Sequence, residues 1–154
     1  NGEMLPFNNL LFGHSKEYAG RLNAGTFVYT NVDGKIFTNT LAAIDTIAFP
    51  ASLDTVPKSA AYDLAWAGTA LQPDETVGIF IGSWTWGQDA LYLQDADGAT
   101  NIVLGKAQLS TLPVGPSTFY MERTVSKKLI EKTTVGGVIN TKYRAKNKVV
   151  QVID

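Results

Sequence analysis

Short apolar runs separated by turn residues every eight to twelve positions dominate the chain. In one run, Tyr62, Leu64 and Trp66 lie at alternate positions, which is typical of a strand with one buried face. The run Thr76–Ser83 shows the same alternation. Regularly spaced short strands with turn signals between them predict an all-β domain, either a sandwich or a barrel.

The same pattern gives the bounds of the expected strands. They are Thr26–Asn31, Lys35–Leu41, Ile44–Phe49, Tyr62–Trp66, Thr76–Ser83, Ala90–Gln94, Thr100–Leu104, Thr118–Val125, Leu129–Val135 and Lys142–Ile153. The first two flank Val32-Asp33-Gly34, and Asp-Gly predicts a tight hairpin because both positions tolerate positive φ. One short helix is expected at Lys106–Leu112, ended by Pro113.

Size and composition fit one domain. The chain has 154 residues and no linker-like stretch, and a domain of this length buries roughly 70% of the surface of its unfolded chain. Cysteine is absent, which excludes disulfides and thiolate chemistry. We therefore expect a single domain over 1–154, with an N-terminal β extension at 1–55 and a core at 56–154.

Charge is distributed unevenly along the chain. From Met121 onward there are eight basic and three acidic residues, a balance of +5. The remainder carries five basic and eleven acidic residues, a balance of −6. This asymmetry predicts an acidic body with one basic end.

No apolar run approaches the ~20 residues that a membrane-spanning helix needs. Because the chain begins at Asn1 rather than at methionine, we expect it to be a processed fragment. The lack of a signal peptide then carries no information on the compartment.

Several segments between residues 60 and 125 together resemble bacterial immunoglobulin-like modules of secreted or lipid-anchored proteins from Bacteroidetes-type bacteria. They are Leu64-Ala65-Trp66, Asp74-Glu75-Thr76-Val77-Gly78-Ile79, Asp95-Ala96-Asp97-Gly98, Leu109-Ser110-Thr111-Leu112-Pro113-Val114-Gly115 and Thr118-Phe119-Tyr120-Met121-Glu122-Arg123. The resemblance implies an immunoglobulin-like β-sandwich in the periplasm, at the cell surface or outside the cell. It also implies a spacer or interaction role, and it transfers no catalytic residue.

Two tryptophans form the most distinctive candidate site. Trp84 and Trp86 are two residues apart, so on an extended chain they project from the same face. Two adjacent indoles could form an apolar platform for sugar rings, with Thr85, Gln88 and Asp89 supplying polar groups at its rim. The alternative is that both indoles pack in the core, which is where large aromatic residues usually lie.

The last expected strand carries a basic stripe. Lys142, Arg144, Lys146 and Lys148 would share one face of it, with Tyr143, Ala145 and Val149 opposite. Such a stripe could bind anionic glycans or lipid headgroups. The alternative is a solvated edge that prevents strand-on-strand aggregation. The acidic remainder of the chain argues against nucleic acid as a partner.

Other chemistry has weak support in the sequence. His14 is the single histidine and has no cysteine nearby with which to bind zinc. Asp95 and Asp97 begin like a calcium loop, but Gly105 and Lys106 stand where a later acidic ligand is needed. The sequence therefore predicts no metal, no cofactor and no catalytic residue.

Together these features favour a non-enzymatic structural or interaction module of a secreted or surface-anchored bacterial protein. Its partner would be a protein or a glycan at the cell surface. A carbohydrate-binding module that uses Trp84 and Trp86 is the alternative. A glycan-active enzyme, which would use paired carboxylates, is a third interpretation.

Overall fold

The computed structural model describes residues 2–20, 24–41, 43–82 and 88–154. Its elements are β1 (Phe7–Asn8), β2 (Gly13–His14), β3 (Gly25–Thr30), β4 (Ile36–Leu41), β5 (Ile47–Ala48), β6 (Thr55–Pro57), β7 (Tyr62–Ala65), β8 (Ala67–Gly68), β9 (Glu75–Gly82), β10 (Ala90–Gln94), β11 (Asn101–Leu104), α1 (Lys106–Leu109), β12 (Gly115–Lys128), β13 (Val138–Arg144) and β14 (Lys148–Ile153). The predicted all-β class is confirmed. Within the described ranges, no helix has the length and apolarity needed to span a bilayer.

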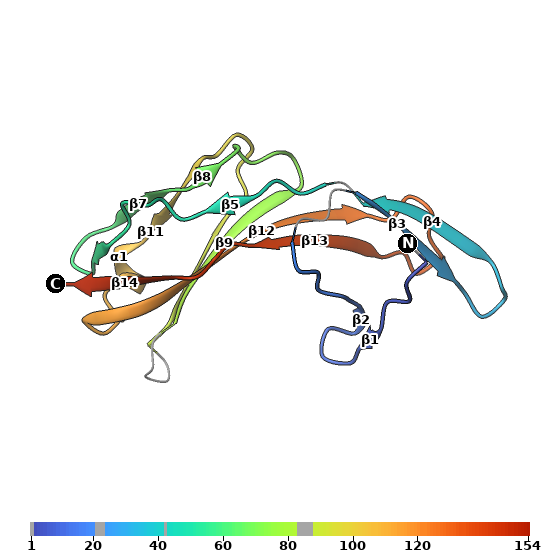
Figure 1. Cartoon of the computed structure of the whole chain (residues 1–154), viewed down its shortest axis with the longest axis horizontal. Helices are drawn as coiled ribbons and strands as arrows, with labels where there is room; N and C mark the ends of the chain where they lie inside the picture. Colours follow the sequence, from blue (N-terminus) through green and yellow to red (C-terminus); the bar gives the residue numbers. More distant parts are fainter. Residues whose placement is uncertain (1, 21–23, 42, 83–87) are drawn as a thin grey trace.

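The main sheet has six strands and curls into a half-barrel. Its order is β10-β9-β12-β14-β6, and β13 pairs with the far part of β12. All these pairings are antiparallel except that of β14 with β6. Figure 1 shows β12 running through the middle of this sheet and extending toward the N-terminal hairpins.

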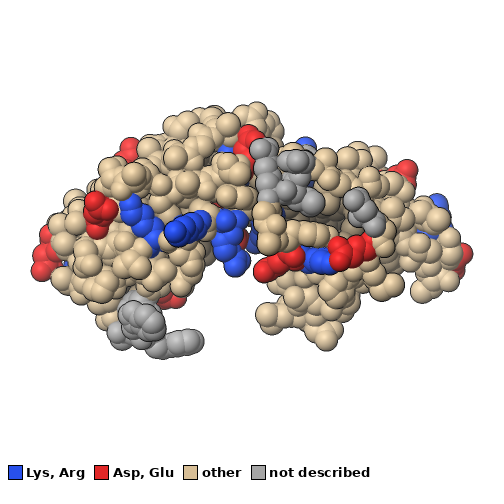
Figure 2. Space-filling view, in the orientation of Figure 1, with Lys and Arg blue, Asp and Glu red and all other residues tan. Residues whose placement is uncertain are grey.

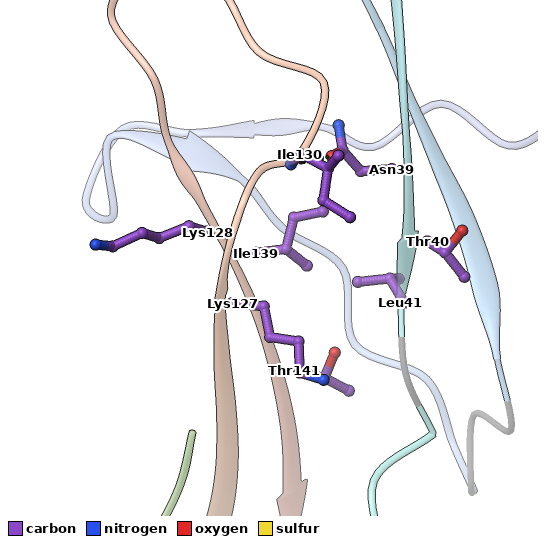
Figure 3. Close-up of a pocket in the computed structure, with 8 residues that line it drawn as sticks. All are labelled: Asn39, Thr40, Leu41, Lys127, Lys128, Ile130, Ile139 and Thr141. Carbon is purple, nitrogen blue, oxygen red and sulfur yellow. Dashed lines mark hydrogen bonds between the residues drawn. The ribbon is translucent and has the colours of Figure 1, made fainter. Parts of the chain in front are cut away.

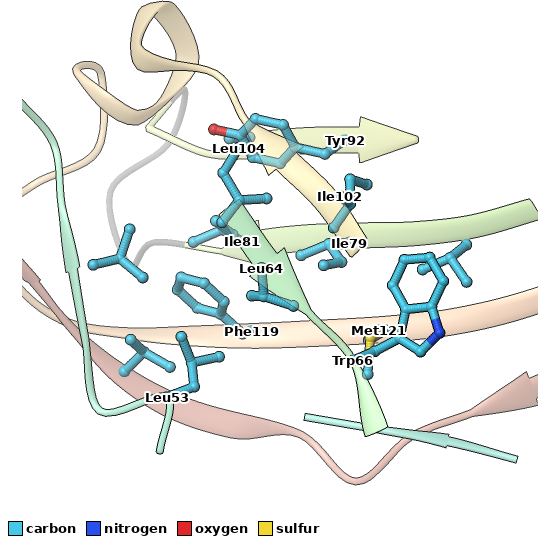
Figure 4. Close-up of a cluster of buried hydrophobic side chains, with 14 of the residues drawn as sticks. Leu53, Leu64, Trp66, Ile79, Ile81, Tyr92, Ile102, Leu104, Phe119 and Met121 are labelled. Atoms are coloured by element: carbon cyan, nitrogen blue, oxygen red, sulfur yellow. The ribbon is translucent and has the colours of Figure 1, made fainter. Parts of the chain in front are cut away.

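A second, smaller layer covers the inner face of the main sheet. It consists of the pairs β7–β11 and β5–β8, with Trp66 between β7 and β8. The core fills the space between the layers, as Figure 4 shows for Trp66, Leu64, Phe119 and Met121. The predicted inward positions Val77, Ile79 and Ile81 of β9 are fully buried. Trp66 is 6% exposed, which confirms the interpretation of its strand face.

The N-terminal hairpin β3–β4 confirms the prediction made from Asp-Gly. Gly34 has φ +76°, the left-handed conformation that glycine adopts without a steric penalty. Its amide donates to the Asn31 carbonyl across 3.0 Å and closes the turn.

The predicted strand Leu129–Val135 is wrong, because this segment is a loop between β12 and β13. The side chain of Asn39 on β4 forms hydrogen bonds with backbone groups of this loop that would pair with a neighbouring strand in a sheet. Its Oδ1 accepts the amides of Ile130 (2.8 Å) and Glu131 (3.1 Å), and its Nδ2 donates to the Glu131 carbonyl (2.8 Å). These bonds also fasten the N-terminal hairpin to the main sheet.

The predicted last strand is interrupted by a β-bulge. Glu122 of β12 pairs with Arg144, and Phe119 of β12 pairs with Lys148. These two pairs are three positions apart on β12 but four positions apart on the partner segment. One extra residue on one strand defines a bulge, which bends the strand and inverts the side-chain alternation beyond it. The chain is therefore β13 before the bulge and β14 after it.

Candidate binding surface

The outer face of the main sheet carries a row of exposed apolar side chains. Leu91 of β10 lies opposite Phe80 of β9, which lies opposite Tyr120 of β12. The three are 55%, 38% and 37% exposed, and Leu93, on the same face of β10, is 67% exposed. We call these four residues the outer-face row.

Two glycines shape the outer-face row. Gly78 and Gly82 flank Phe80 on the same face of β9. A Cβ added to Gly82 would lie 3.1 Å from Phe80 Cε1 and 3.6 Å from Tyr120 Cε2. The two rings therefore lean over bare backbone at Gly82, with their centroids 5.8 Å apart and their planes at 43°. The result is a low aromatic surface without the ridges that side chains at these positions would add.

The predicted sugar platform adjoins this row in the sequence. Trp84, Thr85 and Trp86 belong to the connection from β9 to β10 and lie outside the described residues. Of the polar residues expected at its rim, Gln88 is half-buried and Asp89 is exposed, and both immediately precede β10.

The basic stripe is not one continuous face, because the bulge inverts the alternation. Lys142 and Arg144 are exposed on β13, whereas Lys148 lies on the inward side of β14 with its side chain 23% exposed. Val149, expected to face inward, is instead 62% exposed. Lys146 is exposed within the bulge.

Three of these four cations have acceptors. Lys142 and Arg144 lie 2.7 Å and 3.6 Å from the Glu122 carboxylate. Lys148 donates to the carbonyls of Pro50 and Ala51 and lies 3.6 Å from Asp54 Oδ1. Figure 2 shows Lys and Arg side chains near the middle of the viewed face, around the passage from β13 to β14. Two carboxylates, those of Glu122 and Asp54, therefore offset part of the positive charge of these four residues.

A buried ion pair lies on the inner face of the main sheet, and sequence reasoning missed it. Arg123 of β12 is fully buried and pairs with Glu75 of β9, which is 8% exposed. Its guanidinium also donates to the Thr69 carbonyl and hydroxyl and to the Ala70 carbonyl. All five of its N–H groups thus have acceptors, so the charge is buried with its hydrogen bonds complete.

The Glu75 carboxylate accepts hydrogen bonds both from β12 and from the loop before β9. Its Oε2 accepts the Arg123 guanidinium and the Gln72 amide, the latter at 2.8 Å. The arrangement ties the loop before β9 to the middle of the sheet. We assign the ion pair a structural role, because the buried guanidinium spends its donors on groups within the fold.

Tyr92 is a second buried polar group on the core side. Its hydroxyl makes no hydrogen bond within the described part of the chain, and burial raises its pKa to about 12. Such a phenol stays neutral at physiological pH.

We expect Tyr92→Phe to leave the free energy of unfolding unchanged or to raise it by up to about 1 kcal/mol, because it removes an unpaired buried hydroxyl. The fold favours the neutral phenol, so the native protein loses stability as the pH rises from about 10 through about 12. The variant should lose less over this range. Urea denaturation at about pH 8 and about pH 11 checks both expectations. A loss above about 1 kcal/mol at the lower pH would reveal a hydrogen bond to this hydroxyl.

A shallow pocket lies between β4 and the β12–β13 hairpin (Figure 3). Leu41, Ile130 and Ile139 are among its lining residues, and Lys128 extends away from it. The pocket follows from the Asn39 contacts that join these elements. It brings together no set of groups suited to catalysis.

The remaining chemical candidates lie apart from one another. His14 Nδ1 is 2.8 Å from the Leu5 carbonyl, in an exposed hairpin. Asp95 and Asp97 lie in an exposed turn that ends at Gly98, whose φ is +78°. In the four described ranges, no three His, Asp or Glu side chains are placed to hold a metal ion.

Searches of known families, curated proteins and solved structures return no match for this chain. The resemblance to bacterial immunoglobulin-like modules therefore stays a prediction.

Proposed function

We propose that this domain is a non-catalytic interaction module of a secreted or surface-anchored bacterial protein, with an immunoglobulin-like β-sandwich as its scaffold. Two packed β layers around a central tryptophan support the scaffold assignment. The outer-face row is the surface through which the module binds its partner.

One observation carries this proposal. Three large apolar residues lie side by side across three strands on the solvent side of the sheet. The exposed parts of these side chains contribute nothing to folding, and contiguous exposed apolar surface is a feature of interaction sites. Aromatic residues are also enriched at the centres of protein interfaces.

A photo-crosslinking residue in place of Tyr120 tests the proposal in cell-envelope extracts. We expect a discrete crosslinked protein from position 120. The matched control is Val103, which is 58% exposed on the other layer and should give no such product. Identical products from both positions, or none from either, would contradict the proposal.

Carbohydrate binding is the second candidate, favoured by the two rings that lean over Gly82. Trp84 and Trp86 immediately follow this surface in the chain. Stacking of a few rings on a sugar gives weak, roughly millimolar binding unless polar groups add to it. Binding of soluble polysaccharides that disappears in Phe80→Ala/Tyr120→Ala, without any crosslinked protein, would favour this candidate over the first.

A further inference from the structure

The β1–β2 hairpin presents three consecutive large apolar residues to solvent. Leu10, Leu11 and Phe12 are 87%, 64% and 87% exposed, and we call them the apolar tip. Figure 1 shows the hairpin projecting away from the two β layers. None of the three belongs to the hydrophobic core.

The apolar tip is a defined structure. The Asn8 side chain accepts the amides of Leu10 (2.9 Å) and Leu11 (3.2 Å). Below the tip, the Phe7 ring packs edge-on against His14 with centroids 5.4 Å apart. The hairpin thus satisfies the Leu10 and Leu11 amides internally, which lowers the cost of moving them into a less polar medium.

Phe12 is the clearest sign that the tip serves something outside the chain. Its φ is +48°, a left-handed conformation that a bulky residue adopts only with strain. Glycine or asparagine would relieve that strain, and the exposed ring offers no packing in compensation. Strained residues concentrate at functional sites.

We propose that the apolar tip inserts into the interfacial region of a phospholipid bilayer. The hairpin projects from the rest of the fold (Figure 1), and residues 4–15 contain no Asp, Glu, Lys or Arg. Two residues, Asn8 and Asn9, separate Phe7 from Leu10, and residues 9–12 form a turn, so the tip reaches at most about 10 Å beyond Phe7. That reach matches the ~5–10 Å to which peripheral segments enter a membrane.

The base of the hairpin has the composition of a membrane interface. Lys16 pairs with Glu3 and lies 5.5 Å from the ring centroid of Tyr18, which is 47% exposed. Lysine and tyrosine place an apolar stem or ring in the membrane and a polar end in water. Lys16 and Tyr18 at the base of the hairpin therefore favour a lipid bilayer over a protein pocket as the partner of the apolar tip.

Co-sedimentation with phosphatidylcholine vesicles tests the proposal. We expect the native chain to sediment with them, and Leu10→Ser/Leu11→Ser/Phe12→Ser to lower its partition coefficient at least tenfold. The matched control is Val28→Ser/Val32→Ser/Ile36→Ser, which changes three exposed apolar residues of the other N-terminal hairpin and should bind like the native chain. An unchanged melting temperature shows that each variant is folded.

Adding phosphatidylglycerol to the vesicles should change binding little, because the tip is uncharged. Binding that requires phosphatidylglycerol would contradict the proposal and favour the basic residues near the bulge. Failure of the native chain to bind either vesicle, or equal loss in the control, would also contradict it. Self-association without lipid that the tip variant abolishes would identify a protein contact instead. The tip and the outer-face row share no residue, so either proposal can fail alone.

Discussion

Replacing Arg123 by methionine is expected to lower the free energy of unfolding by about 3–5 kcal/mol. The substitution removes the guanidinium but leaves the Glu75 carboxylate buried, with the Gln72 amide as its remaining described hydrogen-bond donor. It also strips donors from the carbonyls of Thr69 and Ala70. Urea denaturation measures the loss.

Two further variants make this result specific. Arg144→Met breaks an exposed ion pair and should cost less than about 1 kcal/mol. Glu75→Gln combined with Arg123→Met should cost less than the sum of the two single changes, because no unpaired charge remains buried. A loss below about 1 kcal/mol for Arg123→Met would mean that the guanidinium reaches solvent.

Trp66→Ala is expected to cost about 3–5 kcal/mol, the range for emptying a large buried aromatic site. The indole is 6% exposed between the layers, and its Nε1 donates to the Thr69 carbonyl across 3.2 Å. Denaturation monitored by circular dichroism measures the loss.

Val103→Ala provides the control for Trp66, because this apolar residue lies on neighbouring β11 but is 58% exposed. It should change the free energy of unfolding by less than about 1 kcal/mol. A loss of similar size for both substitutions would place Trp66 outside the core.

The inward faces of the central strands could be predicted because their alternation is strict. Val77, Ile79 and Ile81 occupy every second position of β9, so only one face of that strand could pack in the core. In the structure this face is buried. The β3–β4 turn was predictable for a local reason, since Gly34 needs no partner to adopt a positive φ.

The errors came from contacts between residues far apart in the sequence. Leu129–Val135 has the composition of a strand, but Asn39, about ninety positions earlier, supplies its hydrogen bonds. The bulge before Lys148 depends on the register of two strands against β12, which no local pattern discloses.

The sequence held partial signals for the features that it did not assign. Arg123 occupies an inward position between Met121 and Val125, a pattern that indicates a buried ion pair. Its partner Glu75 could not be deduced, because the strand pairing that joins them was unknown. The outer-face row likewise exists only once β10, β9 and β12 are in register.

The affinity of Phe80→Ala/Tyr120→Ala for the partner captured at position 120, measured by calorimetry, tests the central claim most directly. Both rings lie on the solvent side of the sheet, so the variant should stay folded and lose no more than about 1–2 kcal/mol of stability. We predict that its affinity falls at least tenfold, which corresponds to about 1.4 kcal/mol of binding free energy. An affinity equal to that of the native chain would contradict the assignment of the outer-face row as the binding surface.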